Sequence, residues 1–293
     1  CTINATNTGT SDATVSVTST ADPGTRIMAA SGATVVDSGR SAVTGDVTLA
    51  APKDAVPAIT GASDSPAGGF LDLEDFGIVA DAIGDEEAIN YDVPEFVFGG
   101  RTFNRVGVVS NGYLVLGGTQ GSEDIQYLPQ DLPDPARPNG VLSPYWTDLD
   151  GGGQEGVRAS ILSGGGDSWL ALQWDVAIFG DASAHRSMQV WIGLNGTEDI
   201  TYEFADDTVG STTPDGTGLT VGVESVQGVN GAMIAGSPTG TLRVSTTPGE
   251  PGGSVSYTLQ VKGFLAGSHP LVTKMSSTNV SGDTVVRSPI TVN

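Results

Sequence analysis

Apolar and polar residues alternate along much of this chain, which is the pattern of strands that bury one face. In residues 13–18, alanine and valine alternate with threonine and serine, and residues 255–261 repeat the pattern with larger apolar side chains. A period of two places successive side chains on opposite faces of a strand. The nearest approach to helical periodicity, in residues 70–83, is limited to one or two turns by its glycines. The sequence therefore predicts an all-β protein.

Strand candidates crowd the middle of the chain, where the aromatic residues also concentrate. The 42 glycines and 16 prolines of the chain divide it into short segments. The central candidates are residues 96–98, 105–110, 113–116, 157–162, 169–174, 188–194, 201–204 and 219–223. Short strands joined by Asn-Gly, Gly-Gly and Pro-rich turns predict a β-sandwich over residues 59–247.

The two flanks resemble two halves of one immunoglobulin-like sandwich. Residues 1–58 contain several short strand candidates, and residues 248–293 contain three more after a Pro-Gly-rich segment. Each flank is too short to close a seven-strand sandwich alone. We therefore expect the central β-sandwich to be inserted into a split immunoglobulin-like β-sandwich, because insertion at exposed loops is tolerated. The alternative is two incomplete neighbouring domains.

The net charge of the chain limits the classes of molecule that it can bind. The net charge of −22 and the isoelectric point near 4.1 disfavour nucleic acid and anionic lipid surfaces. Charged residues make up only 16% of the chain, so the surface must be mostly neutral and polar, as is typical of secreted or cell-surface proteins. The sequence has no run of 18 apolar residues, and we expect no membrane insertion. The single cysteine, Cys1, allows no internal disulfide and is either a lipid-anchored first residue or the cut end of a longer precursor.

Five segments of the middle region carry a family resemblance. They are FVFGGRTF at 96–103, VGVVSNGY at 106–113, PNGVLSPYWTDL at 138–149, LQWDV at 172–176 and MQVW at 188–191. In this order they resemble the extracellular nidogen-type domain and the non-catalytic domain that follows the protease domain in secreted bacterial subtilisin-like proteases. Residues 6–17 are similar to the opening of bacterial immunoglobulin-like repeats. Residues 286–292 are similar to the last strand of the fibronectin-like domain in those proteases.

Catalytic motifs of such proteases are missing from this sequence. The nucleophilic serine would lie in a Gly-Thr-Ser-Met-Ala turn, which does not occur here. His185 and His269 both lie in segments predicted to be polar surface loops. We therefore expect a chain that is not an enzyme, whatever a longer precursor contains.

An acidic, glycine-rich segment is the strongest metal candidate. Asp148, Asp150 and Glu155 surround a turn of three glycines, and alternating carboxylates at such a turn can offer hard oxygens to Ca²⁺. The spacing departs from that of an EF-hand. The alternative is a solvated hairpin in which Asp148 caps backbone amides. A weaker candidate is the acidic cluster of Asp81, Asp85, Glu86, Glu87 and Asp92, and the acidic turn Asp206-Asp207 is weaker still.

Two local features have both a structural and a functional interpretation. The four tryptophans could stack on sugars, but Trp174 and Trp191 lie in apolar strand contexts that favour core packing. Asn111 and Gly112 predict a hairpin turn of the primed type, with positive φ at both residues.

Two functions are consistent with these features, and a third is weaker. The first is an accessory module that binds a protein partner or substrate, stabilises a protease or attaches it to the cell surface. The second is a structural or adhesive surface protein that self-associates into filaments by donating a strand. The proposed donor segment contains Val285, Val286, Ile290 and Val292, with residues 2–5 as the alternative donor. The third is a carbohydrate binder that uses exposed tryptophans.

Overall fold

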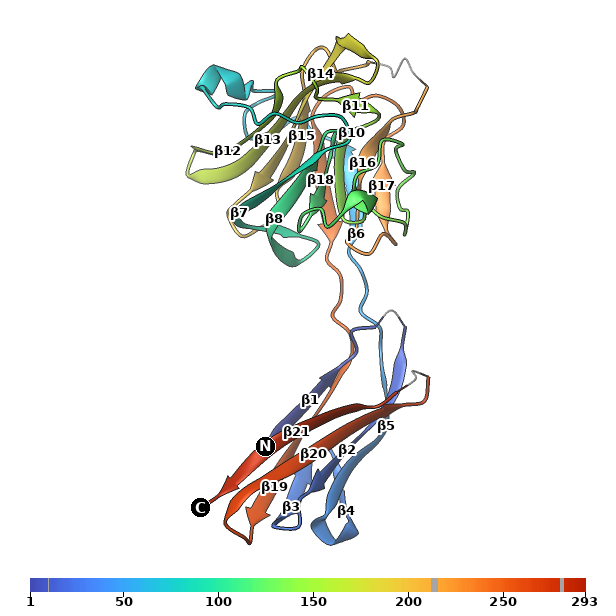
Figure 1. The fold of residues 1–293 in the computed structure, drawn as a ribbon, viewed down its shortest axis with the longest axis vertical. Helices are drawn as coiled ribbons and strands as arrows, with labels where there is room; N and C mark the ends of the chain where they lie inside the picture. Colours follow the sequence, from blue (N-terminus) through green and yellow to red (C-terminus); the bar gives the residue numbers. More distant parts are fainter. Residues whose placement is uncertain (10, 212–215, 280–281) are drawn as a thin grey trace. The chain divides into compact units, whose positions relative to one another are not determined.

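The computed structural model describes residues 1–9, 11–211, 216–279 and 282–293 (Figure 1). Twenty-one strands and three short 3-10 turns make up its regular structure, and the described residues contain no α-helix. The predicted all-β fold class is confirmed. The chain divides into two compact units, which we call unit 1 (Cys1–Lys53 with Glu250–Asn293) and unit 2 (Asp54–Gly249).

Unit 1 combines strands from both ends of the chain in two sheets. Its strands are β1 (Thr2–Thr6), β2 (Ala13–Ala21), β3 (Thr25–Ser31), β4 (Thr34–Val36), β5 (Ser41–Leu49), β19 (Ser254–Gly263), β20 (Gly267–Ser277) and β21 (Thr284–Val292), with the 3-10 turn η1 (Asp37–Gly39). One sheet has the order β1-β19-β3, and the other has the order β21-β20-β2-β5-β4. All neighbouring strands in both sheets are antiparallel.

The core of unit 1 is small and is built from the alternating residues that the sequence singled out. Val17 is 1% exposed, and Tyr257 and Leu259 from the other end of the chain are 2% and 1% exposed. The Tyr257 hydroxyl lies 2.7 Å from the hydroxyl of Ser19, which is fully buried. A buried hydroxyl pair of this kind satisfies both polar groups inside an apolar core.

Unit 2 also consists of two main sheets. Its strands are β6 (Val56–Gly61), β7 (Ala88–Phe98), β8 (Arg101–Val109), β9 (Tyr113–Leu116), β10 (Val141–Trp146), β11 (Leu149–Asp150), β12 (Gly156–Gly164), β13 (Asp167–Ile178), β14 (Asp181–Gly193), β15 (Ile200–Phe204), β16 (Thr220–Glu224), β17 (Gly231–Met233) and β18 (Leu242–Thr247). Its 3-10 turns are η2 (Leu73–Phe76) and η3 (Ser122–Asp124). The sheets have the orders β17-β16-β10-β9-β8-β7 and β11-β13-β14-β15-β18-β6, with β12 also paired to β13.

Large side chains fill the space between the sheets of unit 2. Trp174, Tyr202 and Phe96 are each completely buried. The Trp174 indole donates to the Val109 carbonyl across 2.8 Å, and the Tyr202 hydroxyl donates to the Gly222 carbonyl across 2.9 Å. These bonds connect the two sheets through the core, because the donors and acceptors belong to different sheets.

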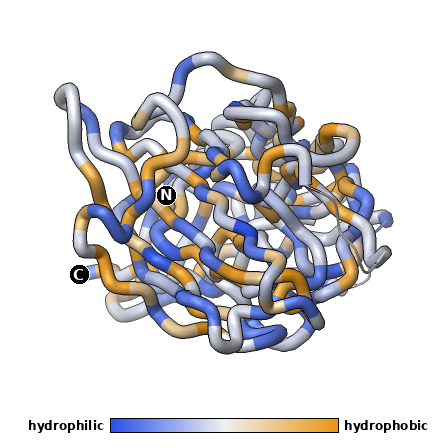
Figure 2. Tube along the Cα trace, turned by 90° about the horizontal axis from the view of Figure 1, so that it is seen from above, coloured by the Kyte–Doolittle hydropathy of each residue, from blue (hydrophilic) through white to orange (hydrophobic). Residues whose placement is uncertain are grey.

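The tryptophans are structural rather than surface groups. Trp146 and Trp174 are 0% exposed and Trp191 is 2% exposed, which confirms the prediction that Trp174 and Trp191 pack in the core. Trp169 is half-buried against a small apolar cluster, and its indole donates to Asp199. The interpretation of the tryptophans as an exposed sugar platform is wrong, because three of the four rings have no accessible face. Short apolar and polar stretches alternate along the trace (Figure 2).

Candidate functional site

The segment that contains Asp148 is held rigidly by its neighbours. Trp146 packs against Tyr113 with ring centroids 4.2 Å apart. The completely buried side chain of Asn111 accepts from the Leu149 amide across 2.8 Å. Asp148 lies between these anchors and is 7% exposed.

Asn111 and Gly112 do not form the predicted primed turn. Gly112 has φ of +77°, but Asn111 is not among the residues with positive φ. A Cβ at Gly112 would lie 2.1 Å from the Tyr145 carbonyl oxygen, so glycine is required there. The prediction was wrong for Asn111 because its side chain serves the neighbouring segment, a tertiary contact that turn statistics do not contain.

Three carboxylates from two segments converge at Asp148. Ligand oxygens of Asp85, Glu86 and Asp148 all lie within 4.8 Å of one another. Asp85 also forms an isolated antiparallel bridge with Asp150. Burial raises the pKa of Asp85, and the negative charges of Glu86 and Asp150 raise it further. Carboxylate oxygens at this spacing are the donor set that Ca²⁺ prefers.

Only one of the three predicted metal ligands belongs to this cluster. The Asp150 carboxylate accepts from the Gly152 amide across 2.6 Å. Glu155 is paired with the guanidinium of Arg158. Asp85 and Glu86 were in the weaker sequence candidate, and the fold brings them to Asp148. Calcium binding stays a prediction.

The remaining members of that weaker candidate have other partners. Asp81 accepts from the Tyr91 hydroxyl across 2.8 Å; burial raises the pKa of Tyr91, and this bond raises it further. Glu87 accepts from the Gly84 amide across 2.8 Å. Asp92 forms a 3.1 Å ion pair with Arg105. These three carboxylates are therefore engaged with partners outside the cluster of Asp85, Glu86 and Asp148.

Unit 2 also has a polar hollow, whose lining does not include Asp85, Glu86 or Asp148. Its volume is about 510 Å³. It is lined by Asp72, Glu74, Gly153, Gln154, Glu155, Asp175, His185, Ser187 and Asp207. Sequence reasoning missed this site as a whole, because its residues come from separate segments that alternation and spacing do not connect. Five of its lining residues are acidic, so it presents a concave, negatively charged surface.

Arg158 of β12 organises one wall of this hollow. Its side chain is 6% exposed and pairs with Asp175 and Glu155, while its Nε donates to the Ile78 carbonyl across 3.0 Å. Burial raises the pKa of Asp175, and the opposing effects of Gln173 and Arg158 are smaller. Glu74 is 3.8 Å from the same guanidinium. One cation therefore partly neutralises a wall that contains three carboxylates.

Two buried glutamines attach the η2 segment to the sheet beside the hollow. Gln173 accepts from the Leu73 amide across 2.9 Å and donates to Asp72 across 2.9 Å. Gln189 donates to the Leu71 carbonyl and to Gln173. Because both glutamines are completely buried, this network fixes Asp72 and Glu74 at the rim.

The two histidines lie in different units and have different surroundings. His185 lies in β14 and is exposed at the hollow, where the Ser187 hydroxyl donates to Asp207 across 3.2 Å. His269 lies in β20, where Nδ1 is 2.7 Å from Asp22 and Nε2 is 2.8 Å from the Leu265 carbonyl. The prediction that both histidines lie in loops was wrong, because each extends a hairpin strand. The hydrogen bond to Asp22 raises the pKa of His269.

The terminal strand, predicted as a strand donor, is β21. It pairs with β20 along its whole length, from Met275↔Thr284 to Gly267↔Val292. Val285 and Val286 are 48% and 54% exposed, whereas Ile290 and Val292 are half-buried. Strand donation itself stays a prediction.

Comparison with known proteins places the chain in a family. No curated protein and no solved structure matches it. Within the described residues, no helix has the length and apolar character needed to cross a membrane. A model of the NIDO-related family matches residues 73–259, a stretch that includes every motif on which the resemblance to nidogen-type domains rests. Because the match covers more than half of the sequence, the chain belongs to the NIDO-related family.

Proposed function

We propose that the chain is a non-catalytic extracellular module that binds a protein partner or substrate through unit 2. In its most specific form, the proposal is that the chain is the C-terminal accessory region of a secreted subtilisin-like protease. Membership of the NIDO-related family and the small share of charged residues, 16%, support an extracellular role.

The polar hollow of about 510 Å³ is the observation that carries the proposal. It is concave, it is fixed by a buried network, and its carboxylates outnumber the one guanidinium in its wall. A lysine or arginine side chain of a partner would replace its hydration with carboxylate contacts there. We infer that the preferred partner surface is basic.

The contacts of the serine, aspartate and histidine side chains that could act in catalysis also agree with a binding role. The Ser187 hydroxyl donates to a carboxylate, and Asp175 is held by Arg158 and Gln173. His269 lies in unit 1, where it is engaged at both ring nitrogens. In a Ser-His-Asp triad the serine hydroxyl donates to a histidine, whereas the Ser187 hydroxyl donates to the Asp207 carboxylate.

Binding of a fluorescent oligolysine peptide tests the proposed hollow. The double variant Glu74→Gln/Asp207→Asn should weaken binding several-fold, more strongly at low salt. The matched control Glu95→Gln/Asp46→Asn changes the net charge equally at exposed positions that do not line the hollow. Equal weakening by both variants would mean that only the overall charge matters and would reject the site.

Activity assays test the non-catalytic part. The purified chain should not hydrolyse casein, a fluorogenic peptide or an activated ester above the rate of buffer. Hydrolysis that is lost in Ser187→Ala or His185→Asn would overturn this part of the proposal and assign chemistry to the hollow.

Self-association by strand donation is a second candidate function, favoured by the exposed valines of β21. Donation would require β21 to leave the nine register pairs that it forms with β20. Electron microscopy and light scattering of concentrated protein should reveal filaments if donation occurs. A monodisperse monomer would reject this second function and leave the first intact.

A further inference from the structure

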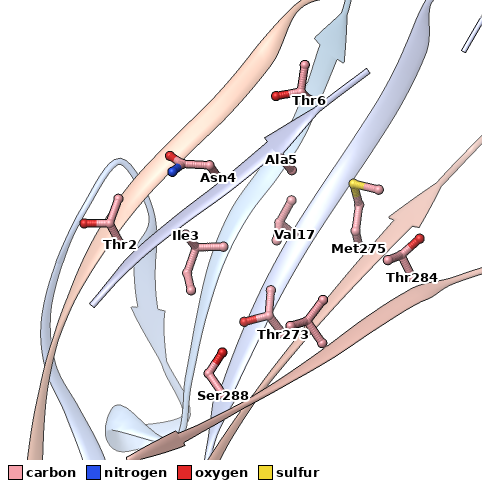
Figure 3. A pocket seen from close by; sticks show the side chains of 11 residues that line it. Thr2, Ile3, Asn4, Ala5, Thr6, Val17, Thr273, Met275, Thr284 and Ser288 are labelled. Atoms are coloured by element: carbon pink, nitrogen blue, oxygen red, sulfur yellow. The ribbon is translucent and has the colours of Figure 1, made fainter. Parts of the chain in front are cut away.

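The two sheets of unit 1 differ in width, and one edge of the sandwich is open as a result. The narrower sheet has three strands and ends at β1, while the wider sheet has five and ends at β21. A groove of about 310 Å³ lies at this edge. Residues 2–6 of β1 form one wall, and side chains of β20 and β21 form much of the other (Figure 3).

The inner face of the wider sheet is covered only in part. Leu271 is 1% exposed, whereas Val286 is 54% exposed. The register pairs Leu271 with Ser288 and Thr273 with Val286, so these side chains share one face of the sheet. Val286 therefore faces inward but is open to solvent. An additional strand paired with β1 would lie above the Val286 side chain.

The hydrogen-bond pattern of β1 shows which of its main-chain groups face the open edge. Cys1 and Leu259 exchange main-chain bonds of 3.0 and 2.7 Å, and the Asn7 amide donates to the Gly253 carbonyl across 2.9 Å. In an antiparallel pair, bonded and non-bonded residues alternate. The odd-numbered residues of β1 are therefore bonded to β19, and the even-numbered residues point their main-chain groups away from it.

Thr2, Asn4 and Thr6 thus offer main-chain donors and acceptors along the free edge of β1. Within the described residues, no strand pairs with this edge. Ile3 and Ala5 are half-buried on the inner side. A free edge beside an uncovered apolar face is the geometry of strand addition, in which main-chain bonds supply affinity and alternate side chains supply selectivity.

The lining of the groove restricts its occupant. None of its lining residues is charged, although the chain carries a net charge of −22. A charged side chain inserted between the sheets would lose water and find no opposite charge. A hollow of about 190 Å³ shares Thr6, Met275 and Thr284 with the groove and continues it. The occupant that complements this surface is extended and uncharged, with small apolar side chains at alternate positions.

We propose that this groove binds an extended, uncharged segment of a partner protein, which adds a strand to the free edge of β1 and covers the inner face of β21. The groove belongs to unit 1 and does not depend on the polar hollow of unit 2, so either assignment can fail alone. A second copy of this chain is the competing occupant.

Two variants block the groove in different ways. Asn4→Pro removes an amide that points away from β19, so the chain's own ladder keeps its bonds. Val286→Lys places an ammonium group over the apolar floor. Val285→Lys is the matched control, because Val285 is similarly exposed on the same strand but faces outward. Thermal unfolding of each variant checks that unit 1 remains folded.

Selection from a phage library of random octapeptides on the full chain, with Asn4→Pro protein as the counter-selection, tests the proposal. We expect binders without charged residues and with alternating small apolar positions. Asn4→Pro and Val286→Lys should each weaken them at least tenfold, about 1.4 kcal/mol, whereas Val285→Lys should not. No binder sensitive to Asn4→Pro, a charged consensus, or equal effects of the two lysines would overturn the proposal. Dimers in light scattering that Asn4→Pro converts to monomers would assign the groove to a second copy instead.

Discussion

The hydrophobic cores of unit 2 and unit 1 are built from apolar side chains of very different size. The main core of unit 2 contains large rings such as Trp174, Tyr202 and Phe96, all completely buried. The main core of unit 1 has Tyr257 as its one fully buried ring and contains small residues such as Ala21 and Ala42. Both units are two-sheet β structures, but the sheets of unit 1 differ in width and leave an inward-facing valine exposed.

The comparison separates two ways of presenting a binding surface. In unit 2 a well-filled core supports a rigid rim, and polar side chains on that rim form the candidate site. In unit 1 the inner face of the wider sheet is incompletely covered, and the free main-chain groups of β1 form the candidate contact. Substitutions of the polar side chains on the rim should therefore weaken binding by unit 2. Binding by unit 1 should instead be blocked by a proline that removes a main-chain amide of β1.

The largest expected effect is on the stability of unit 2. Trp174→Ala should reduce its free energy of unfolding by about 3–5 kcal/mol, because a buried ring and its bond to Val109 are lost. Leu259→Ala should reduce that of unit 1 by about 2–4 kcal/mol. Calorimetry should show each variant shifting one transition only. A common shift would contradict independent cores.

Removing Arg158 should have the next largest effect. Arg158→Met leaves the Asp175 carboxylate, which is only 16% exposed, without its cation, at a cost of about 2–4 kcal/mol. Arg158→Met/Asp175→Asn should recover part of the loss, because the buried charge is gone. Chemical denaturation of the three proteins measures this coupling. Additive losses would mean that the ion pair does not organise the wall of the hollow.

A change in pH should alter the stability of unit 2 through the protonation of Glu224. Burial raises its pKa to about 7, against the opposing effect of its bond from the Asp134 amide. Between the ordinary pKa of a glutamate and pH 7, the folded state holds a proton that the unfolded state releases, so stability falls as pH rises through this window. The change is about 1–2 kcal/mol after solvent screening. The unit 2 transition of Glu224→Gln should show little of this dependence, as calorimetry from pH 4.5 to 8 would establish.

The smallest effect should come from the His269–Asp22 pair of unit 1. Because the pKa of His269 is raised, its contribution is complete below pH 6.5 and is lost as pH rises through the higher folded value. His269→Asn should make the unit 1 melting temperature less sensitive to pH between 6 and 9 while leaving unit 2 unchanged. An unchanged pH profile would contradict a charged pair.

Sequence periodicity predicted the strands better than it predicted the sites. The strand expected at residues 113–116 is β9. Residues 70–83, where glycines limit any helix to one or two turns, contain only the 3-10 turn η2 at Leu73–Phe76. Alternation is a local property, and it survives in the fold because each strand buries one face.

The candidate sites depend on contacts between distant segments. Neighbours in sequence suggested Asp148, Asp150 and Glu155 as a group, but Arg158 pairs with Glu155 and the fold brings Asp85 and Glu86 to Asp148. The groove of unit 1 follows from the unequal number of strands in its sheets, which periodicity does not specify.

Hydrogen exchange at single amides is the most direct test of the contrast between a filled unit 2 and an open unit 1. We expect the amides of Asn4 and Thr6 to exchange quickly, while those of Ile3 and Ala5 are protected by β19 and those in the middle of β13 and β14 exchange slowest of all. Equal protection at positions 3 to 6 would show that the edge of β1 is already covered and would contradict the open groove.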